Sequence, residues 1–131
     1  MSTLHANTPR DAVSRLETMV LMAGIELPSR AIREQIASAI NLIVHLSRLR
    51  DGTRRVTHLT EVTGMESGVI TLQDIFTLDH TSDIGDDGLI HASLVPTGIR
   101  PAFAEKLKGE GLPIPARLLG SADPVRALRP R

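Results

Sequence analysis

The chain is poor in the residue types that several functional classes need. Its 131 residues include no cysteine, no tryptophan, no tyrosine and only two phenylalanines. The absence of cysteine excludes disulfides and thiolate metal sites, and the shortage of aromatic rings removes the usual platforms for stacking nucleic-acid bases. The formal net charge is zero, which gives no overall attraction to nucleic acid. No apolar run approaches the ~20 residues of a membrane-spanning helix. We therefore predict neither a nucleic-acid partner nor a direct membrane span.

The phosphate-binding loop of nucleotide hydrolases is also absent. The pattern G-x-x-x-x-G-K-[ST] occurs nowhere, and the only lysines are Lys106 and Lys108, in the C-terminal quarter. Without that loop the chain has nothing to cradle the phosphates of a nucleotide or to anchor Mg²⁺. We therefore expect the chain by itself to be unable to hydrolyse ATP.

Metal binding is not indicated either. The acid-rich segment 79–88 lacks the alternating ligand spacing and the closing glutamate of an EF-hand calcium loop. Four histidines have no metal-like spacing, and we expect them to be structural or at the surface: His45, His58, His80 and His91. The prediction for metal ligands is none.

The first eleven residues hold the candidate site. Thr3 and His5 are two residues apart, as they would be on one face of a short strand. Thr8-Pro9-Arg10-Asp11 is typical of a helix start, with Thr8 as the N-cap and Pro9 at the first helical position. Two donors beside the positive end of a helix would suit a phosphate group. An inert, solvated histidine is the alternative interpretation.

The remaining pattern predicts an α/β fold of two helices, an antiparallel β meander and a short C-terminal helix. The first helix should end at Gly24 and bury an apolar stripe of Leu16, Met19, Val20 and Ala23. The second should follow Pro28 with Ser29 as its cap, and bury Ile32, Ile36, Ala39, Ile40 and Ile43.

After the second helix the spacing of apolar residues changes from the helical pattern to the alternation of β-strands, which predicts the meander. Expected strands are 42–49, 55–62, 69–76 and 89–95, with turns at Asp51-Gly52, at Ser67-Gly68 and at Pro96-Thr97-Gly98. A short helix is expected from Pro101 to about Lys108.

Charge is segregated along the chain. The segment from Arg30 to Arg55 holds six arginines against Glu34 and Asp51, and the acidic segment that follows balances it. This indicates a dipolar molecule suited to docking on copies of itself or on a charged partner, although a solvated surface is the simpler interpretation. Two helices joined across 24–28 resemble a helix-turn-helix, but zero net charge disfavours a DNA-binding regulator.

Several strings resemble type II/IV secretion system ATPases, most closely the CpaF-like branch that powers tight-adherence pilus assembly. The match lies in residues 1–19, 28–39, 42–44, 48–57, 61–66, 70–76 and 96–101. It begins with Met-Ser-Thr-Leu-His-Ala-Asn-Thr-Pro-Arg-Asp, which is similar to the histidine box of that family, and runs to about Leu119. The organisation implied is a C-terminal part of the ATPase domain over 1–119 and a flexible Pro/Arg tail over 120–131.

The resemblance implies a RecA-like P-loop domain that binds ATP and Mg²⁺. Such proteins form hexameric rings on the cytoplasmic side of the inner membrane and act with the platform proteins of secretion or pilus machinery. Thr3 and His5 would be the catalytic residues near the γ-phosphate, and His5 and Asn7 the nucleotide-binding ones. The phosphate-binding loop and acidic boxes precede the histidine box in the family, so the resemblance suggests a truncated gene or an internal start and no bound cofactor in this chain alone.

Two functions therefore remain in view. The first is a C-terminal fragment of a secretion ATPase that supplies the γ-phosphate sensor and subunit contacts without independent turnover. The second is a non-enzymatic interaction module that docks on full-length ATPase rings and modulates them. If the upstream strands of the sheet are missing, apolar side chains of the two helices would be exposed to solvent. The fragment would then be marginally stable, oligomeric or dependent on a partner.

Overall fold

The computed structural model describes residues 1–79 and 84–120 of the chain. Two helices, α1 (Pro9–Met22) and α2 (Ser29–Ala39), precede four strands, β1 (Leu42–Arg48), β2 (Arg54–Glu66), β3 (Val69–Leu78) and β4 (Leu94–Pro96). Helix α3 (Phe103–Gly109) and a 3-10 turn, η1 (Ala116–Leu119), follow. The α/β class and the predicted order of two helices, meander and short helix are confirmed. The predicted tail lies outside the described residues from 121 onward.

Helix α1 begins as its sequence predicts. The Thr8 hydroxyl accepts a hydrogen bond from the Asp11 backbone N–H at 3.0 Å, and Pro9 occupies the first helical position. Gly24, at φ 73°, turns the chain after the helix end. The predicted stripe needs correction, because Met19 is 53% exposed and Ala23 is an exposed residue after the helix end. The buried side of the helix starts earlier, at Pro9, Ala12 and Val13.

Helix α2 differs from the prediction at its start. Ser29 is its first helical residue rather than its cap, and Pro28 holds the cap position without a side-chain hydrogen bond. Ile32 and Ile36 are buried as expected, whereas Ala39 is exposed. Ile43, predicted on the same stripe, lies in β1 instead. The ring of Pro28 fixes its φ (−56°), and its ψ of 140° gives the non-helical conformation of a cap residue, so the helix begins here without a side-chain cap.

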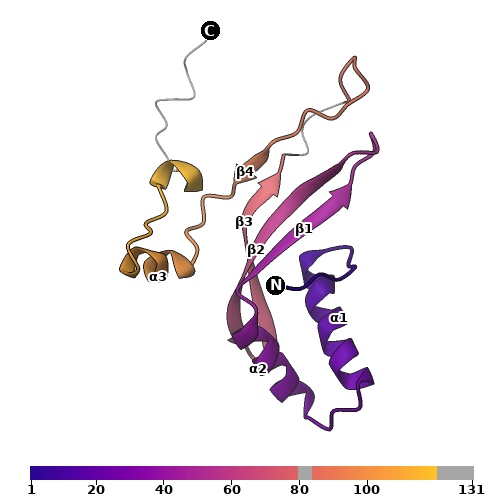
Figure 1. Ribbon diagram of the computed structural model, residues 1–131, viewed down its shortest axis with the longest axis vertical. Coiled ribbons are helices and arrows are strands. Elements are labelled where there is room, and N and C mark those ends of the chain that lie inside the picture. The colour runs from indigo at the N-terminus through magenta and orange to yellow at the C-terminus, as the bar shows by residue number, and fades with distance from the viewer. Residues whose placement is uncertain (80–83, 121–131) are drawn as a thin grey trace.

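The sheet is an antiparallel meander with strand order β1-β2-β3-β4. Helices α1 and α2 cover one end of it, and α3 lies on the far side of the strands from α1 (Figure 1). Irregularities in register fall between His45 and Leu46, between Leu59 and Thr60, and between Val62 and Gly64. These bulges increase the local twist of the long β2 strand.

The last predicted strand is much shorter than expected. Only Leu94–Pro96 pairs with β3, while Ile84 and Ile90 form an isolated bridge. The apolar run from Leu89 had suggested a full strand, but Ile90 and Ala92 instead pack against Leu78 in a small separate cluster. In this segment the side chains of Ile90 and Ala92 are buried, although the backbone does not pair with β3 as a regular strand before Leu94.

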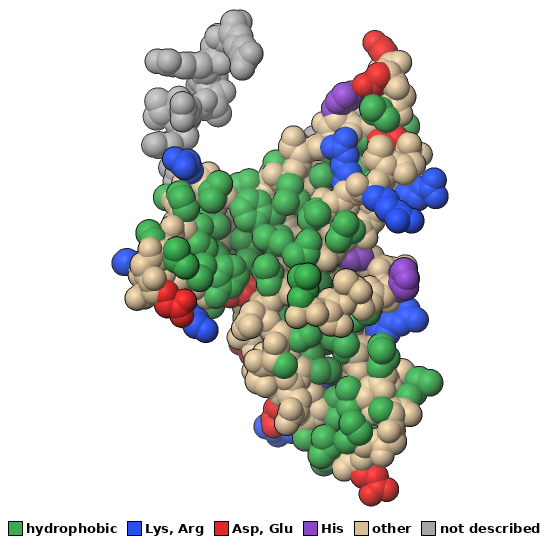
Figure 2. All heavy atoms as spheres, in the orientation of Figure 1, with side chains coloured by type: hydrophobic (Ala, Val, Ile, Leu, Met, Phe, Trp, Pro, Cys, Tyr) green, Lys and Arg blue, Asp and Glu red, His purple; other side chains and the backbone are tan. Residues whose placement is uncertain are grey.

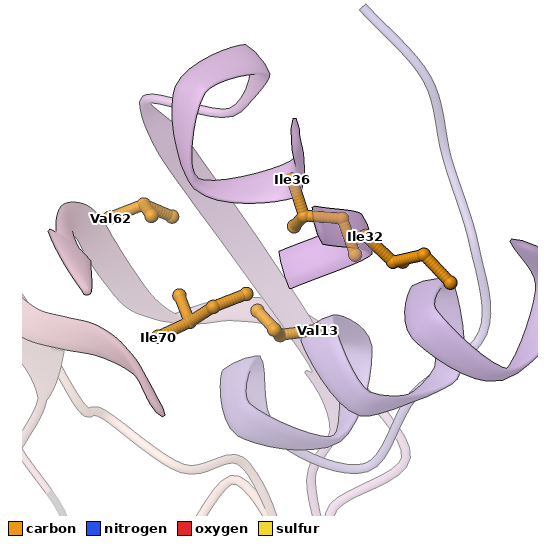
Figure 3. Packing of buried hydrophobic residues seen from close by; sticks show 5 residues of the cluster. All are labelled: Val13, Ile32, Ile36, Val62 and Ile70. Carbon is orange, nitrogen blue, oxygen red and sulfur yellow. The ribbon is translucent and has the colours of Figure 1, made fainter. Parts of the chain in front are cut away.

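The main core lies between the two helices and the sheet. Five buried residues form it, Val13, Ile32, Ile36, Val62 and Ile70, and they converge from α1, α2, β2 and β3 (Figure 3). All are aliphatic, as the aromatic-poor composition requires. At about 1.5–3 kcal/mol for each large apolar side chain taken out of water, this cluster is the main stabilising contact between helices and sheet.

Polar contacts tie the helices to the β2–β3 turn. The Arg33 side chain forms hydrogen bonds to both Glu17 carboxylate oxygens at 3.0 Å and to the Gly68 carbonyl at 3.1 Å. Arg10 donates to the Ile70 carbonyl. Two of the arginines in the N-terminal half are thus used within the fold, which joins α1 and α2 to the same turn.

Candidate functional site

The three predicted site residues are all exposed in the segment before α1. Thr3, His5 and Asn7 are exposed, whereas Leu4 and Ala6 between them are half-buried. This alternation is typical of an extended chain, in which successive side chains point to opposite sides. Within the described residues, the side chains of Thr3, His5 and Asn7 make no hydrogen bonds. Their donors are therefore available to a ligand.

The segment is held in place from the helix that follows it. Arg15 on α1 donates a hydrogen bond from Nη1 to the His5 carbonyl oxygen at 2.9 Å. Leu4 and Ala6 anchor the segment by their partial burial. The polar side chains thus lie just before the N-terminal, positive end of a 14-residue helix.

One expectation about this segment is wrong. Thr3 and His5 do not lie on a strand, because residues 1–6 belong to no helix or strand. The exposure of their side chains alternates as predicted, but no strand of the described residues pairs with them. The local sequence can set the alternation, whereas a strand also requires a hydrogen-bonded neighbour.

The chemistry available at this segment is limited to hydrogen-bond donation and charge. A threonine hydroxyl, a histidine ring and an asparagine amide can each donate to phosphate oxygens. Across residues 1–79 and 84–120, no group of three or more His, Asp or Glu side chains is arranged to hold a metal ion. The site can therefore contact a phosphate but not assemble a metal centre from the described residues.

A pair of histidines that sequence spacing did not connect meets across two strands. His45 on β1 and His58 on β2 are directly paired, with ring centroids 5.8 Å apart. Ser47 Oγ lies 3.2 Å from His45 Nε2, and Thr57 Oγ1 lies 3.0 Å from His58 Nδ1. His45 is buried. The predicted structural role is supported for His45, and the cluster satisfies polar groups inside the sheet.

The other two predicted histidines are at or beyond the acidic segment. His91 is exposed, and its Nε2 lies 2.8 Å from an Asp87 carboxylate oxygen, in agreement with a surface role. His80 lies outside the described residues, as does Asp83. Asp87 also accepts the Leu89 backbone N–H at 3.0 Å, so this carboxylate stabilises a turn. No calcium-type ligand group is found among the described acids.

Charged side chains in the arginine-rich segment bond mostly within the chain. Arg55 donates to the Ala92 carbonyl at 3.0 Å, Arg48 donates to the Gly52 carbonyl, and Arg30 pairs with Glu34 at 3.0 Å. On the face drawn in Figure 2, charged side chains lie around the periphery and apolar ones gather across the middle. Exposed apolar surface is thus a more prominent feature of this face than a single-sign charge patch.

Asp51, in the β1–β2 turn, holds the loop that carries Ile90. Its carboxylate accepts the Ile90 backbone N–H at 2.8 Å and the Thr53 hydroxyl at 2.7 Å. The pKa of this carboxyl is lowered, first by the hydrogen bond from Ile90 and then by that from Thr53. Asp51, which the sequence predicted only as part of a turn, therefore also joins this turn to the loop that carries Ile90. We call this contact the Asp51 tether.

Because Asp51 must be ionised to hold these contacts, the stability that it contributes should depend on pH. A carboxyl with a lowered pKa in the folded chain contributes stability that is present above its unfolded value of about 3.9 and is lost as the pH falls through the lower folded value. We expect Asp51→Asn to be less stable than the wild type at neutral pH, and this difference to shrink below about pH 4. Urea unfolding from about pH 6 to about pH 2 measures it. A constant difference over that range would contradict the tether.

No helix in the described residues is long and apolar enough to cross a membrane. No protein-family model matches the chain. Two curated proteins from two strains of Mycobacterium tuberculosis are each 30% identical to it over 67 residues. Each is named a "putative conjugal transfer protein", and the match covers 51% of this chain. The chain matches only 18% of the length of these relatives, so the likeness concerns a limited part of much longer proteins.

Proposed function

We propose that the chain is the C-terminal part of an ATP-hydrolysing motor of a secretion or conjugation system. In this proposal the segment before α1 contacts the γ-phosphate of ATP bound to a phosphate-binding loop that this chain does not contain. The observation that carries the proposal is the exposure of Thr3, His5 and Asn7 just before the N-terminal end of α1. Their side chains accept and donate no hydrogen bonds within the described residues. The partial likeness to proteins named for conjugal transfer is in keeping with it.

Each residue has a distinct task in this proposal. The Thr3 hydroxyl and the His5 ring donate to a γ-phosphate oxygen, which bears more negative charge as the bond to the β-phosphate breaks. Asn7 adds an exposed amide donor beside them. Arg15 is a positioning residue, because it holds the His5 carbonyl while leaving the ring free. ATP and Mg²⁺ would be held mainly by the missing loop and its acidic partners.

The wider setting is part of the same proposal. We propose that the fold is of RecA-like origin and that the chain belongs to a ring of identical subunits on the cytoplasmic side of the inner membrane, beside the platform proteins of the machinery. Only the phosphate contact and part of the subunit surface would come from the described residues. The proposal therefore separates phosphate sensing from nucleotide binding.

A direct test is phosphate release from MgATP by the purified chain. We expect no release above a blank without protein, because no group in the sequence replaces the phosphate-binding loop. Steady turnover that disappears in His5→Ala would contradict the claim that the site is incomplete. If the chain is instead a module that modulates intact rings, adding it to a full-length ATPase would change the rate equally for the wild type and for His5→Ala.

A further inference from the structure

The outer edge of β1 is free in the described structure. β1 is the first strand in the order β1-β2-β3-β4, so only one of its sides pairs with another strand. No backbone hydrogen bond joins the other side to residues in 1–79 or 84–120. An unpaired strand edge presents a row of N–H and C=O groups that can template pairing with another chain.

The side chains of this edge strand are unusual for an exposed edge. Leu42, Val44 and Leu46 are 39%, 50% and 58% exposed, and they alternate with the more buried Ile43 and His45. They therefore project from one face of the strand. Edges that avoid association normally carry charges, prolines or bulges. The β1–β2 pair has one irregularity, after His45, but residues 41–47 contain no charged residue and no proline.

We propose that β1 is a self-association strand, on which a second copy of the chain pairs antiparallel with its two-fold axis at Val44. In this register Leu42 of each copy lies opposite Leu46 of the other, and the two Val44 side chains face each other. Every exposed apolar residue of β1 is then matched by an apolar residue. The four-stranded sheet of one copy continues into that of the second.

The self-matching apolar pattern favours a second copy as the occupant, and the register also keeps like charges apart. The nearest charged residue, Arg48, falls opposite Ile40 of the second copy in this register, so the two Arg48 side chains lie at opposite ends of the paired segment. A register centred on His45 would instead place Arg48 opposite Leu42. The contact is isologous, with the same patch used by both copies, and it goes beyond the ring proposed above, whose contacts are head-to-tail.

The absence of cysteine in the natural chain gives a sharp test. In Val44→Cys the single thiol can form a disulfide only between chains, and the proposed register brings the two thiols together at the axis. We expect rapid oxidation of this variant to a covalent dimer. The matched control is Val69→Cys, since Val69 is 55% exposed at the start of β3 and away from the β1 edge. Equal rates of cross-linking at the two positions would overturn the proposal.

Solution mass provides the second readout. Light scattering after gel filtration should show the wild-type chain as a dimer that dissociates on dilution. Val44→Lys places two like charges directly opposite each other, so we expect dimerisation to weaken by more than about tenfold, while Val69→Lys dimerises as the wild type does. Circular dichroism checks that each variant folds. A wild-type chain that is monomeric at all concentrations would overturn the proposal and leave the β1 edge for a different partner.

Discussion

Replacing Glu61 with alanine is expected to lower the free energy of unfolding by about 3 kcal/mol. Glu61 is 3% exposed on β2, yet no arginine or lysine pairs with it among the ion pairs of the described residues. Its two carboxylate oxygens instead accept the backbone N–H groups of Ala102 at 3.0 Å and Phe103 at 3.1 Å. These N–H groups belong to the first turn of α3, where no intrahelical acceptor exists.

The loss has two parts. Two hydrogen bonds to a buried carboxylate disappear, and two backbone donors beside the buried Ala104 are left without a partner. Glu61→Gln should not rescue the contact fully, because an amide offers one acceptor oxygen and its NH₂ group would face a backbone N–H. We therefore expect both variants to be destabilised and α3 to detach first.

Urea unfolding at neutral pH measures the effect, and hydrogen exchange at the Ala102 and Phe103 amides locates it. Glu66, exposed at the end of the same strand, gives the matched control, and Glu66→Gln should change stability by less than about 0.5 kcal/mol. If Glu61→Ala unfolds like the wild type, or if the two α3 amides exchange no faster, then the carboxylate does not hold the helix.

The sequence predicted those features that depend on neighbouring residues. The Thr8-Pro9 start of α1, the turn at Gly24 after its end and the hairpin turns at Asp51-Gly52 and Ser67-Gly68 all follow from local conformational preferences. The predicted Ser29 cap was wrong because α2 begins one residue earlier than expected, with Pro28 at the cap position. Local rules also allowed a long strand at 89–95, although tertiary burial of Ile90 took precedence there.

Contacts that depend on strand register could not be predicted from the sequence. The contact between Glu61 and α3 joins residues 41 and 42 positions apart, and no local pattern signals it. The pairing of His45 with His58 requires the irregularity that follows His45. For the candidate site, the alternation of Thr3, His5 and Asn7 could be predicted from their spacing, whereas the support from Arg15 could not.

The second large effect concerns His5 as a donor to the γ-phosphate. A chimera can supply the missing loop by placing residues 1–119 of this chain behind the phosphate-binding part of a secretion ATPase, at the position of its own histidine box. We expect this chimera to hydrolyse ATP. Removal of one preorganised donor from a site of developing charge lowers kcat by about 10²–10³-fold. His5→Ala should therefore reduce kcat to that extent with little change in KM, because the missing loop supplies most of the nucleotide binding.

A matched histidine distinguishes this role from a general effect on the fold. His91 is exposed on the loop beyond β3, and its partner among the described residues is Asp87, so His91→Ala in the same chimera should keep kcat unchanged. Thr3→Ala should resemble His5→Ala, since both side chains are exposed in the same segment and both can donate to phosphate.

The central claim is that the segment before α1 senses the γ-phosphate, and the steady-state kcat of the His5→Ala chimera tests it most directly. A fall of about a hundredfold or more at saturating MgATP, with nucleotide binding retained, is the result that the proposal predicts. A kcat within about twofold of the unmutated chimera would contradict it, because a donor to the transition state cannot be removed without a much larger loss.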